Sequence, residues 1–233
     1  MSEVLLECRD LTKKYGGLTA LDHISFSVGS GKMIGLLGPN GSGKTTFIKL
    51  LTGLLQPDDG SILVDGMAPG VGTKEIVAYL PDNHFINSYM TVEQIVDYFK
   101  DFYQDFKEER AYRMFSELGI DKTVQLKTLS KGNKEKVALI LIMSRDAKLY
   151  VLDEPIAGVD PATRDYIIST IINNYNPEAS VIISTHLISD IEQVLDEVIF
   201  IQNGKILLQK EVDEIRNEEG KSVDQLFREV FRW

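Results

Sequence analysis

The chain has 233 residues, of which 43% are hydrophobic and 26% charged, so its composition is that of a folded globular protein and excludes global disorder. Lys and Arg number 25 against 35 Asp and Glu, and the net charge of −10 argues against a general attraction to nucleic acid or anionic lipid. The longest apolar run, residues 137–143, is far shorter than the roughly 20 residues of a membrane-spanning helix.

The first third of the chain has the pattern of β-strands. Apolar residues alternate in 24–28, and residues 4–8 and 33–37 form two further apolar segments bounded by turn residues. The N-terminus lacks the basic and apolar segments of a signal peptide, and the single cysteine cannot form an internal disulfide. We therefore expect a reducing, cytosolic setting.

A glycine-rich segment follows the third strand and fits the pattern G-x-x-x-x-G-K-[ST]. We call it the phosphate loop; it consists of Gly38, Pro39, Asn40, Gly41, Ser42, Gly43, Lys44, Thr45 and Thr46. A helix is predicted from Thr45 to Leu51, so the loop has the required strand before it and helix after it.

The residue types of the phosphate loop suit a nucleoside triphosphate and Mg²⁺. Glycines let successive backbone N–H groups point at phosphates, Lys44 can reach the β- and γ-oxygens, and the Thr45 hydroxyl is a ligand for Mg²⁺. The alternative is a glycine-rich turn that matches the pattern by chance.

The middle of the chain changes to a helical period. Apolar residues at 92, 95, 96 and 99 share one helical face, and a charged helix is predicted over 107–118. We place a helical lobe at about 83–130. Ser130 is a candidate N-cap for a following helix over 131–143.

Strands alternate with helices in the last third. Residues 149–152, 181–183 and 198–201 are predicted strands, and Asp160-Pro161 has the cap and first-turn proline of a helix. This alternation predicts an α/β fold with a parallel-rich sheet, to which the N-terminal strands add an antiparallel β portion. We expect a single domain over 1–233.

Within that domain we expect three parts. The catalytic core covers about 1–82 and 131–210, the helical lobe about 83–130, and a helical C-terminal tail about 211–233.

Two adjacent carboxylates, Asp153 and Glu154, follow the strand at 149–152, at the sheet edge where parallel sheets bind ligands. Asp153 is placed to hold Mg²⁺, and Glu154 to polarise a water that attacks the γ-phosphate, as a general base. The alternative for such a pair is a loop acid or a helix cap.

Three histidines differ in their context. His186 follows residues 181–185 and so reaches the same sheet edge, where the alternative is a structural or merely exposed side chain. His23 and His84 lack this context and are interpreted as surface residues.

Motifs along residues 3–210 resemble, in their order, those of the ATP-binding subunits of ABC transporters. The matching segments are Lys14-Tyr15-Gly16 (aromatic loop), the phosphate loop, Ala78 to Asp82 (Q-loop), Leu129-Ser130-Lys131-Gly132-Asn133 (the signature segment), Asp153-Glu154 (Walker B pair), Ala157 to Pro161 with Asp160 (D-loop), and Ser184-Thr185-His186 (switch histidine).

The resemblance implies a P-loop NTPase fold of the ABC ATPase type and assigns roles to these residues. Tyr15 would stack on adenine, and His186 would contact the γ-phosphate and position the water that Glu154 activates. Two chains would pair head to tail as an ATP-dependent homodimer, in which each signature segment completes the ATP site of the other chain.

Two motifs depart from the family pattern. Asp82 replaces the usual Q-loop glutamine; it is an expected Mg²⁺ ligand with Thr45 and Asp153, or else a turn aspartate after Pro81. Lys131 replaces a glycine of the signature and Asn133 a glutamine. Lys131 either adds a cation near the partner's γ-phosphate or lies in solvent.

The resemblance implies Mg²⁺-dependent ATP hydrolysis that energises an integral membrane permease on a separate chain, docked on the helical lobe near the Q-loop. The Leu-Ser-Lys-Gly variant is similar to that of the ATPases of ABC-2 type exporters, so export is expected. The chain would then be cytoplasmic, peripheral on the inner face of the cell membrane, with no nucleic acid partner.

Three alternatives remain open. A nontransport ABC ATPase would have a basic surface or a long heptad insertion, and the sequence has neither. An ATP-sensing regulatory module is compatible with Asp82 and the altered signature, but Glu154 and His186 argue against it. An importer subunit would use the same chemistry, and the transported substrate is not encoded in these motifs.

Overall fold

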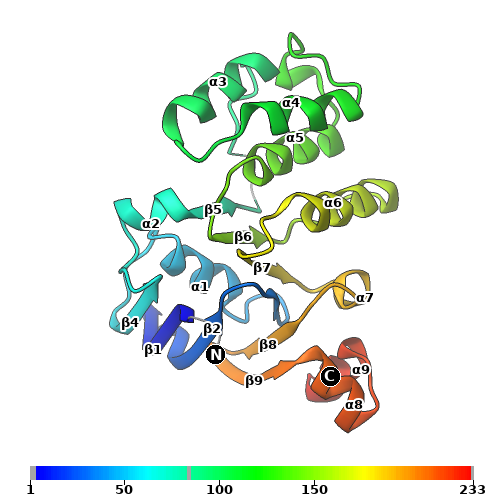
Figure 1. The fold of residues 1–233 in the computed structure, drawn as a ribbon. Coiled ribbons are helices and arrows are strands. Elements are labelled where there is room, and N and C mark those ends of the chain that lie inside the picture. Colours follow the sequence, from blue (N-terminus) through cyan, green and yellow to red (C-terminus); the bar gives the residue numbers. More distant parts are fainter. Residues whose placement is uncertain (1–3, 83–84, 232–233) are drawn as a thin grey trace.

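The computed structural model describes residues 4–82 and 85–231 (Figure 1). His84, the first residues of the predicted helical lobe and the ends of the chain lie outside this range.

The strands are β1 (Val4–Tyr15), β2 (Leu18–Gly29), β3 (Met33–Leu37), β4 (Asp59–Val64), β5 (Val77–Leu80), β6 (Leu149–Asp153), β7 (Ser180–Thr185), β8 (Glu197–Gln202) and β9 (Lys205–Glu211). The helices are α1 (Lys44–Leu51), α2 (Val71–Ile76), α3 (Val92–Phe102), α4 (Glu108–Glu117), α5 (Lys131–Met143), α6 (Pro161–Asn174), α7 (Ile188–Ile191), α8 (Val212–Glu219) and α9 (Val223–Val230), with a 3₁₀ turn at Leu126–Thr128.

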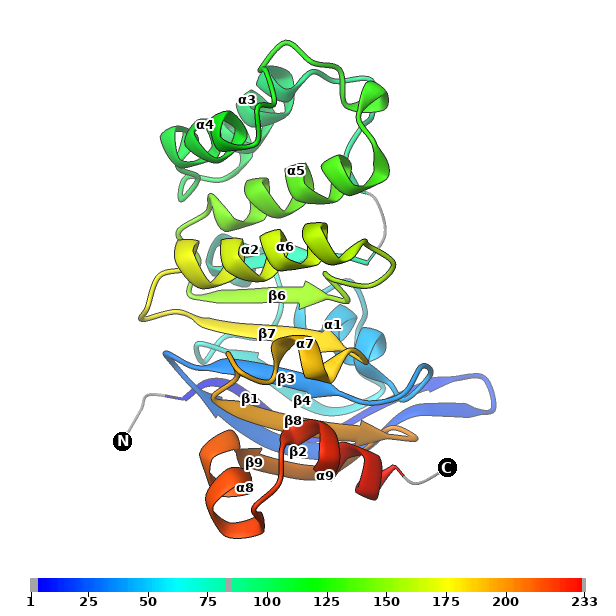
Figure 2. The ribbon, with the colours of Figure 1, turned by 90° about the vertical axis from the view of Figure 1, so that its right-hand side faces the viewer.

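Two sheets organise the described residues. The larger has the strand order β5-β6-β7-β3-β8-β9, in which β9 is antiparallel to β8 and the other neighbours are parallel. The smaller is antiparallel, with the order β2-β1-β4. Figure 2 shows β6, β7, β3 and β8 running in the same direction. The predicted parallel-rich α/β fold with an antiparallel β portion is confirmed.

The parallel strands of the larger sheet are largely buried on both faces, which explains their apolar runs, whereas the edge strand β9 has only exposed and half-buried residues. In β3, Met33 and Leu37 face the core shared with the helical layers, whereas Ile34 and Leu36 face the core shared with α1 and the smaller sheet. The same alternation divides Val198 and Phe200 of β8 from its other apolar residues. The sheet is therefore a rigid platform with loops at its ends.

The helices lie in layers beyond that sheet. In Figure 1, α3 and α4 lie farthest from the strands, and α5 and α6 lie between them and the sheet. Ser130 caps α5 as predicted, because its Oγ accepts a hydrogen bond from the backbone N–H of Asn133 at 3.2 Å. Asp160 and Pro161 begin α6, also as predicted.

The N-terminal strands are longer than the predicted 4–8 and 24–28. The pairing of β1 with β2 shifts register between Cys8 and Leu11, and Asp10 and His23 have positive φ angles of 48° and 49°. These bulges interrupt the two-residue period, so the pattern underestimates the strands. The strands β4, β5 and β9 and helix α2 were not predicted.

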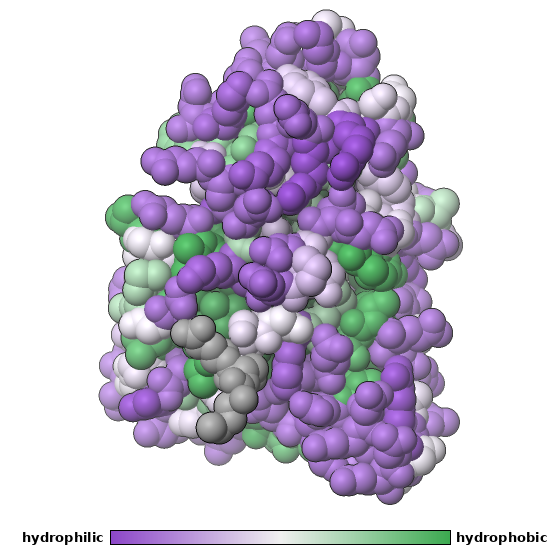
Figure 3. All heavy atoms as spheres, in the orientation of Figure 1, coloured by the Kyte–Doolittle hydropathy of each residue, from purple (hydrophilic) through white to green (hydrophobic). Residues whose placement is uncertain are grey.

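The surface fits the sequence composition. Among the described residues, no helix is both long and apolar enough to cross a membrane. Figure 3 shows that the face of the molecule seen in Figure 1 is largely hydrophilic, with separate apolar areas.

Candidate functional site

Neighbouring strands of the larger sheet bring most of the predicted site residues to one edge. β5 is followed by Asp82, β6 ends at Asp153, β7 is followed by His186, and β3 leads into the phosphate loop. These strands are consecutive and parallel in the sheet, so their carboxyl ends lie side by side. Ligands of open α/β sheets bind at such an edge.

The phosphate loop has a backbone that requires glycine. Gly41 and Gly43 have φ angles of 79° and 115°, in the region that side chains disfavour. A Cβ on Gly38 would lie 2.2 Å from the carbonyl oxygen of Ile201, so the close packing of the loop on β8 also excludes a side chain there. Because the backbone geometry and packing of the loop need glycine at these positions, a chance match to the pattern is disfavoured.

The loop leads directly into the N-terminus of α1. Gly43 is the N-cap and supplies no side-chain cap, so the first N–H groups of the helix are available to an anion. Lys44 is buried, and its Nζ donates to the carbonyl oxygens of Gly38 and Pro39 at 2.8 and 3.3 Å. Its ammonium is therefore held over the loop.

The remaining loop residues differ in exposure. Asn40 and Gly41 are exposed, Thr46 is half-buried in the first turn of α1, and Ser42 is buried.

Asp153 is buried beside the phosphate loop. Its Oδ1 accepts hydrogen bonds from Ser184 Oγ at 2.6 Å and Thr45 Oγ1 at 3.5 Å. Within the described residues its Oδ2 is buried without a hydrogen-bond partner. Burial raises the pKa of Asp153, and the nearby carboxylates of Asp82 and Glu154 raise it further, against the two hydroxyl hydrogen bonds.

Two side-chain nitrogen atoms lie close to the Glu154 carboxylate. Its Oε2 lies 3.0 Å from His186 Nδ1, and its Oε1 lies 3.5 Å from Lys44 Nζ. The residue has a φ of 50°, and its backbone N–H donates to both Ser184 O and Ser184 Oγ at 3.0 Å. Strained backbone of this kind persists where the surroundings fix it, and it clusters at functional sites.

Ser184 was missed as a contributor to the site. It belongs to the motif at the end of β7, but its hydroxyl connects Asp153 to the backbone of Glu154. The signal that the sequence offers is a serine directly after the apolar run 181–183 of a buried strand, because a buried hydroxyl needs partners.

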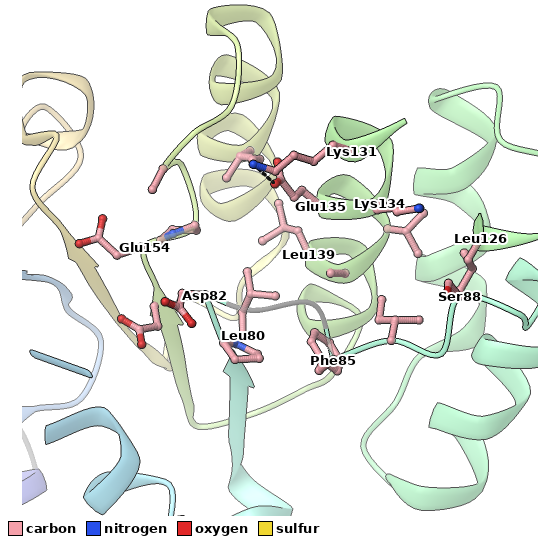
Figure 4. Close-up of a pocket in the computed structure, with 18 residues that line it drawn as sticks. Leu80, Asp82, Phe85, Ser88, Leu126, Lys131, Lys134, Glu135, Leu139 and Glu154 are labelled. Atoms are coloured by element: carbon pink, nitrogen blue, oxygen red, sulfur yellow. Dashed lines mark ion pairs between the residues drawn. The ribbon is translucent and has the colours of Figure 1, made fainter. Parts of the chain in front are cut away.

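Asp82 lies beside the carboxylate pair and lines a cavity of about 400 Å³ (Figure 4). Asp82 and Glu154 lie on one side of the cavity and Lys131 of α5 on the other, with Leu80, Phe85 and Leu139 also lining it. Asp82 is exposed, so its carboxylate is accessible to a cation.

Tyr15 ends β1 and is 45% exposed, with Lys13 Nζ 5.9 Å from its ring centroid. The paired strand β2 packs on the phosphate loop, since a Cβ on Gly43 would lie 2.7 Å from the carbonyl oxygen of Ala20. Strand β2, which pairs with β1, therefore borders the phosphate loop. Stacking of Tyr15 on adenine stays a prediction.

The signature segment does not join its own chain's phosphate loop. Among the described residues, no hydrogen bond or ion pair connects the two, and Leu129, Gly132 and Asn133 are half-buried while Ser130 is exposed at the start of α5. A Cβ on Gly132 would lie 3.2 Å from Thr163 Oγ1 of α6. The segment therefore borders the D-loop side.

The side chain of Lys131 is exposed, and a role at a partner's γ-phosphate stays a prediction. Its Nζ forms an ion pair with Glu135 Oε1 at 3.7 Å and lies 3.4 Å from the place that a Cβ on Gly158 would take. The side chain is exposed, yet it bends toward the D-loop of its own chain.

Asp160 acts as a helix cap in the structure. Its carboxylate accepts from the backbone N–H of Thr163 at 3.0 Å and from Thr163 Oγ1 at 2.7 Å, and these bonds lower the pKa of Asp160. A D-loop role at a second chain stays a prediction.

Comparison with known proteins agrees with this geometry. A protein-family model described as "ABC transporter" matches residues 21–157. The chain is 34% identical over 209 residues to the "SkfA peptide export ATP-binding protein SkfE" of Bacillus subtilis, covering 87% of each chain. It is 31% identical over 222 residues to the "probable multidrug ABC transporter ATP-binding protein YbhF" of Escherichia coli, covering 92% of this chain and 38% of that protein.

A solved structure also matches over almost the whole fold. The chain resembles "Structure of ATP binding subunit of ABC transporter" with a TM-score of 0.87 and 27% identity, covering 98% of this chain and 100% of that one.

Proposed function

The chain belongs to the ABC transporter family as an ATP-binding subunit with ATPase activity, and from this premise we propose that it drives a membrane exporter through a site shared between two copies. The observation that carries the proposal is the meeting of the phosphate loop, Asp153, Glu154 and His186 at the ends of adjacent strands. Each element of phosphate binding and water activation has a residue at this edge.

In the proposed reaction, the phosphate loop and the N-terminus of α1 bind the ATP phosphates, and Lys44 contacts the γ-phosphate. Glu154 accepts a proton from the attacking water, and His186, 3.0 Å from the Glu154 carboxylate, orients that carboxylate and contacts the γ-phosphate. Tyr15 stacks on the adenine ring. No covalent intermediate is required for such a displacement.

We propose Mg²⁺ as the cofactor, with Thr45, Asp153 and Asp82 holding it. The donor set consists of a hydroxyl and carboxylate oxygens, which Mg²⁺ prefers. The buried Oδ2 of Asp153, which has no hydrogen-bond partner within the described residues, fits a cation ligand. When bound, Mg²⁺ neutralises charge on the β- and γ-phosphates.

Substituting Asp82 tests this ligand set. We expect Asp82→Ala to raise the Mg²⁺ concentration for half-maximal ATPase activity several-fold, roughly three- to tenfold, because one charged ligand is lost. Asp82→Gln, which restores an oxygen donor, should return most of the affinity. The measurement is ATPase rate against Mg²⁺ concentration at saturating ATP. If Asp82→Ala has the wild-type Mg²⁺ dependence, Asp82 is a turn residue and not a ligand.

We propose that a second copy completes the site. The support is the position of the signature segment, which lies at the exposed start of α5 and, within the described residues, forms no hydrogen bond or ion pair with its own phosphate loop. Ser130 and the Gly132 N–H at that helix N-terminus have the chemistry to bind a phosphate. An ATP-dependent homodimer places them against the partner's ATP.

Export and a cytoplasmic position at the inner face of the membrane complete the proposal. The relatives SkfE and YbhF are named for peptide export and multidrug transport, and the Leu-Ser-Lys-Gly variant points to the ABC-2 type exporters. The permease docks on the helical lobe, where Tyr98 and Phe102 of α3 are 47% and 67% exposed and their rings lie 4.5 Å apart. Exposed paired aromatics of this kind mark contact surfaces.

Affinity capture from solubilised native membranes tests the partnership. The tagged chain should recover a multi-span membrane protein, and Tyr98→Ser with Phe102→Ser should reduce that recovery by about tenfold, the loss of roughly one buried aromatic contact. Leu54→Ser, a change at another exposed apolar side chain, is the matched control. Recovery of soluble proteins or nucleic acid alone would favour a nontransport ATPase.

A further inference from the structure

The short helix α7 begins two residues after His186, so its placement sets the position of that side chain. Leu187 donates its backbone N–H to Thr185 Oγ1 at 3.0 Å and supplies no side-chain cap to the helix. A helix of one turn is not stable by itself, so tertiary contacts must hold α7. Ile188 and Ile191 are buried and provide part of that support.

An ion pair attaches α7 to α6. Arg164 Nη1 donates to Asp190 Oδ2, and the two side chains are 25% and 27% exposed. Arg164 lies in the first turn of α6, where its backbone N–H donates to Asp160 O at 3.0 Å. The ion pair therefore joins the helix that starts at the D-loop to the helix that follows His186.

Stability alone is a poor explanation for this ion pair. Within the described residues, Nε of Arg164 is buried without a hydrogen-bond partner, which costs desolvation free energy. Partly buried ion pairs contribute little net stability once desolvation is counted. The Arg164–Asp190 ion pair is therefore better explained by the relative position in which it holds α6 and α7.

The C-terminal end of α7 is also attached to the C-terminal helices. Glu192 Oε2 accepts from the backbone N–H of Asp224 in α9, and Glu192 O accepts from Arg216 Nη2 in α8, both at 3.1 Å. The tail is itself fixed to the sheet, because Phe227 and Phe231 pack on Phe200 of β8 with ring centroids 5.4 and 5.7 Å away.

We propose that Arg164, Asp190 and Glu192 are positioning residues that hold α7 between α6 and the C-terminal helices and thereby set His186 against Glu154. The inference rests on the roles proposed above for His186 and Glu154. In this arrangement the C-terminal helices support ATP hydrolysis by holding α7. The Arg164–Asp190 ion pair connects α6, which starts at the D-loop, to α7, which follows His186 in the same chain.

Steady-state kinetics test the α6 side of this arrangement. Arg164→Ala and Asp190→Ala should each lower kcat by about tenfold while the KM for ATP stays within about twofold, because the phosphate loop is untouched. The double variant should fall no further than the single ones, since both remove the same link. Arg164→Lys, which keeps the charge, should recover a kcat within about threefold of wild type.

Matched controls separate positioning from general support of the fold. Arg113 of α4 donates to Asn174 Oδ1 at the far end of α6 at 3.3 Å, so Arg113→Ala should leave kcat unchanged. On the tail side, Glu192→Ala should lower kcat, whereas Glu192→Gln keeps the acceptor oxygen and should not. Wild-type kcat in Asp190→Ala, or an equal loss in Arg113→Ala, overturns the proposal.

Amide hydrogen exchange provides a readout that does not depend on turnover. The backbone N–H of Glu192 donates to Ile188 O at 2.9 Å, and exchange there should rise about tenfold in Arg164→Ala, Asp190→Ala and Glu192→Ala. Unchanged exchange would overturn the proposal even if kcat fell. Absence of ATPase activity in the wild type would instead count against the proposed function, and exchange would still decide whether α7 is held in this way.

Discussion

Glu154→Gln is expected to bind ATP at least as tightly as wild type and to lose about 10²- to 10⁴-fold in turnover, the contribution of a general base. The glutamine amide has nearly the same shape but does not accept the proton of the attacking water. Binding should be kept because Glu154 Oε1 lies 3.5 Å from Lys44 Nζ, where its negative charge competes with the phosphates for the ammonium. ATPase rates and equilibrium binding of a fluorescent ATP analogue, measured on the same preparation, separate the two effects.

Glu109→Gln is the matched control for that experiment. Glu109 is an exposed glutamate in the first turn of α4, far along the chain from the catalytic loops, and its substitution should leave both quantities unchanged. If Glu154→Gln hydrolyses ATP at the wild-type rate, Glu154 is a loop acid and the general base is another group.

The sequence predicts the residues at the ends of the strands better than the strands themselves. The phosphate loop and the carboxylate pair come directly after short apolar runs, and His186 follows the strand that contains the run 181–183. Parallel strands of that kind place the residues at their carboxyl ends along one edge of the sheet. Strand order was not predictable, because the neighbours β3 and β7 are separated by more than half of the chain and by several helices.

Contacts between distant residues account for the features that the sequence does not reveal. Arg145 is buried, and it pairs with Asp105 while donating to the carbonyl oxygens of Val77, Lys74 and Glu75. Nothing in the local pattern distinguishes Arg145 from a surface arginine at the end of a helix.

The position of Lys131 also depends on tertiary packing. Its ion pair with Glu135 and its approach to Gly158 depend on how α5 packs beside the D-loop.

A site shared between two copies predicts that two inactive variants restore activity when mixed. Lys44→Ala removes the ammonium of the phosphate loop, and each charge-assisted hydrogen bond lost to phosphate should weaken ATP binding about tenfold or more. Ser130→Arg places a bulky side chain at the exposed start of α5, where it blocks approach of the partner's γ-phosphate. Each variant alone should be inactive, because both sites of each homodimer carry its lesion.

In the heterodimer, one site carries both lesions and the other combines an intact Lys44 with an intact Ser130. Lys49→Ala mixed with Ser130→Arg is the control pairing, since the exposed Lys49 lies on the same helix outside the phosphate loop. Unlike Lys44→Ala, Lys49→Ala should be active before mixing.

The most direct test of the shared site is therefore the ATPase rate of the Lys44→Ala and Ser130→Arg mixture, measured together with the amount of ATP-dependent dimer by size-exclusion chromatography. A shared site predicts activity in the mixture well above that of either variant. Equimolar random pairing makes half of the dimers heterodimers, each with one intact site of two, so about a quarter of the wild-type rate is expected if that site turns over by itself. A mixture with neither activity nor ATP-dependent dimer, beside a wild type that shows both, would contradict it.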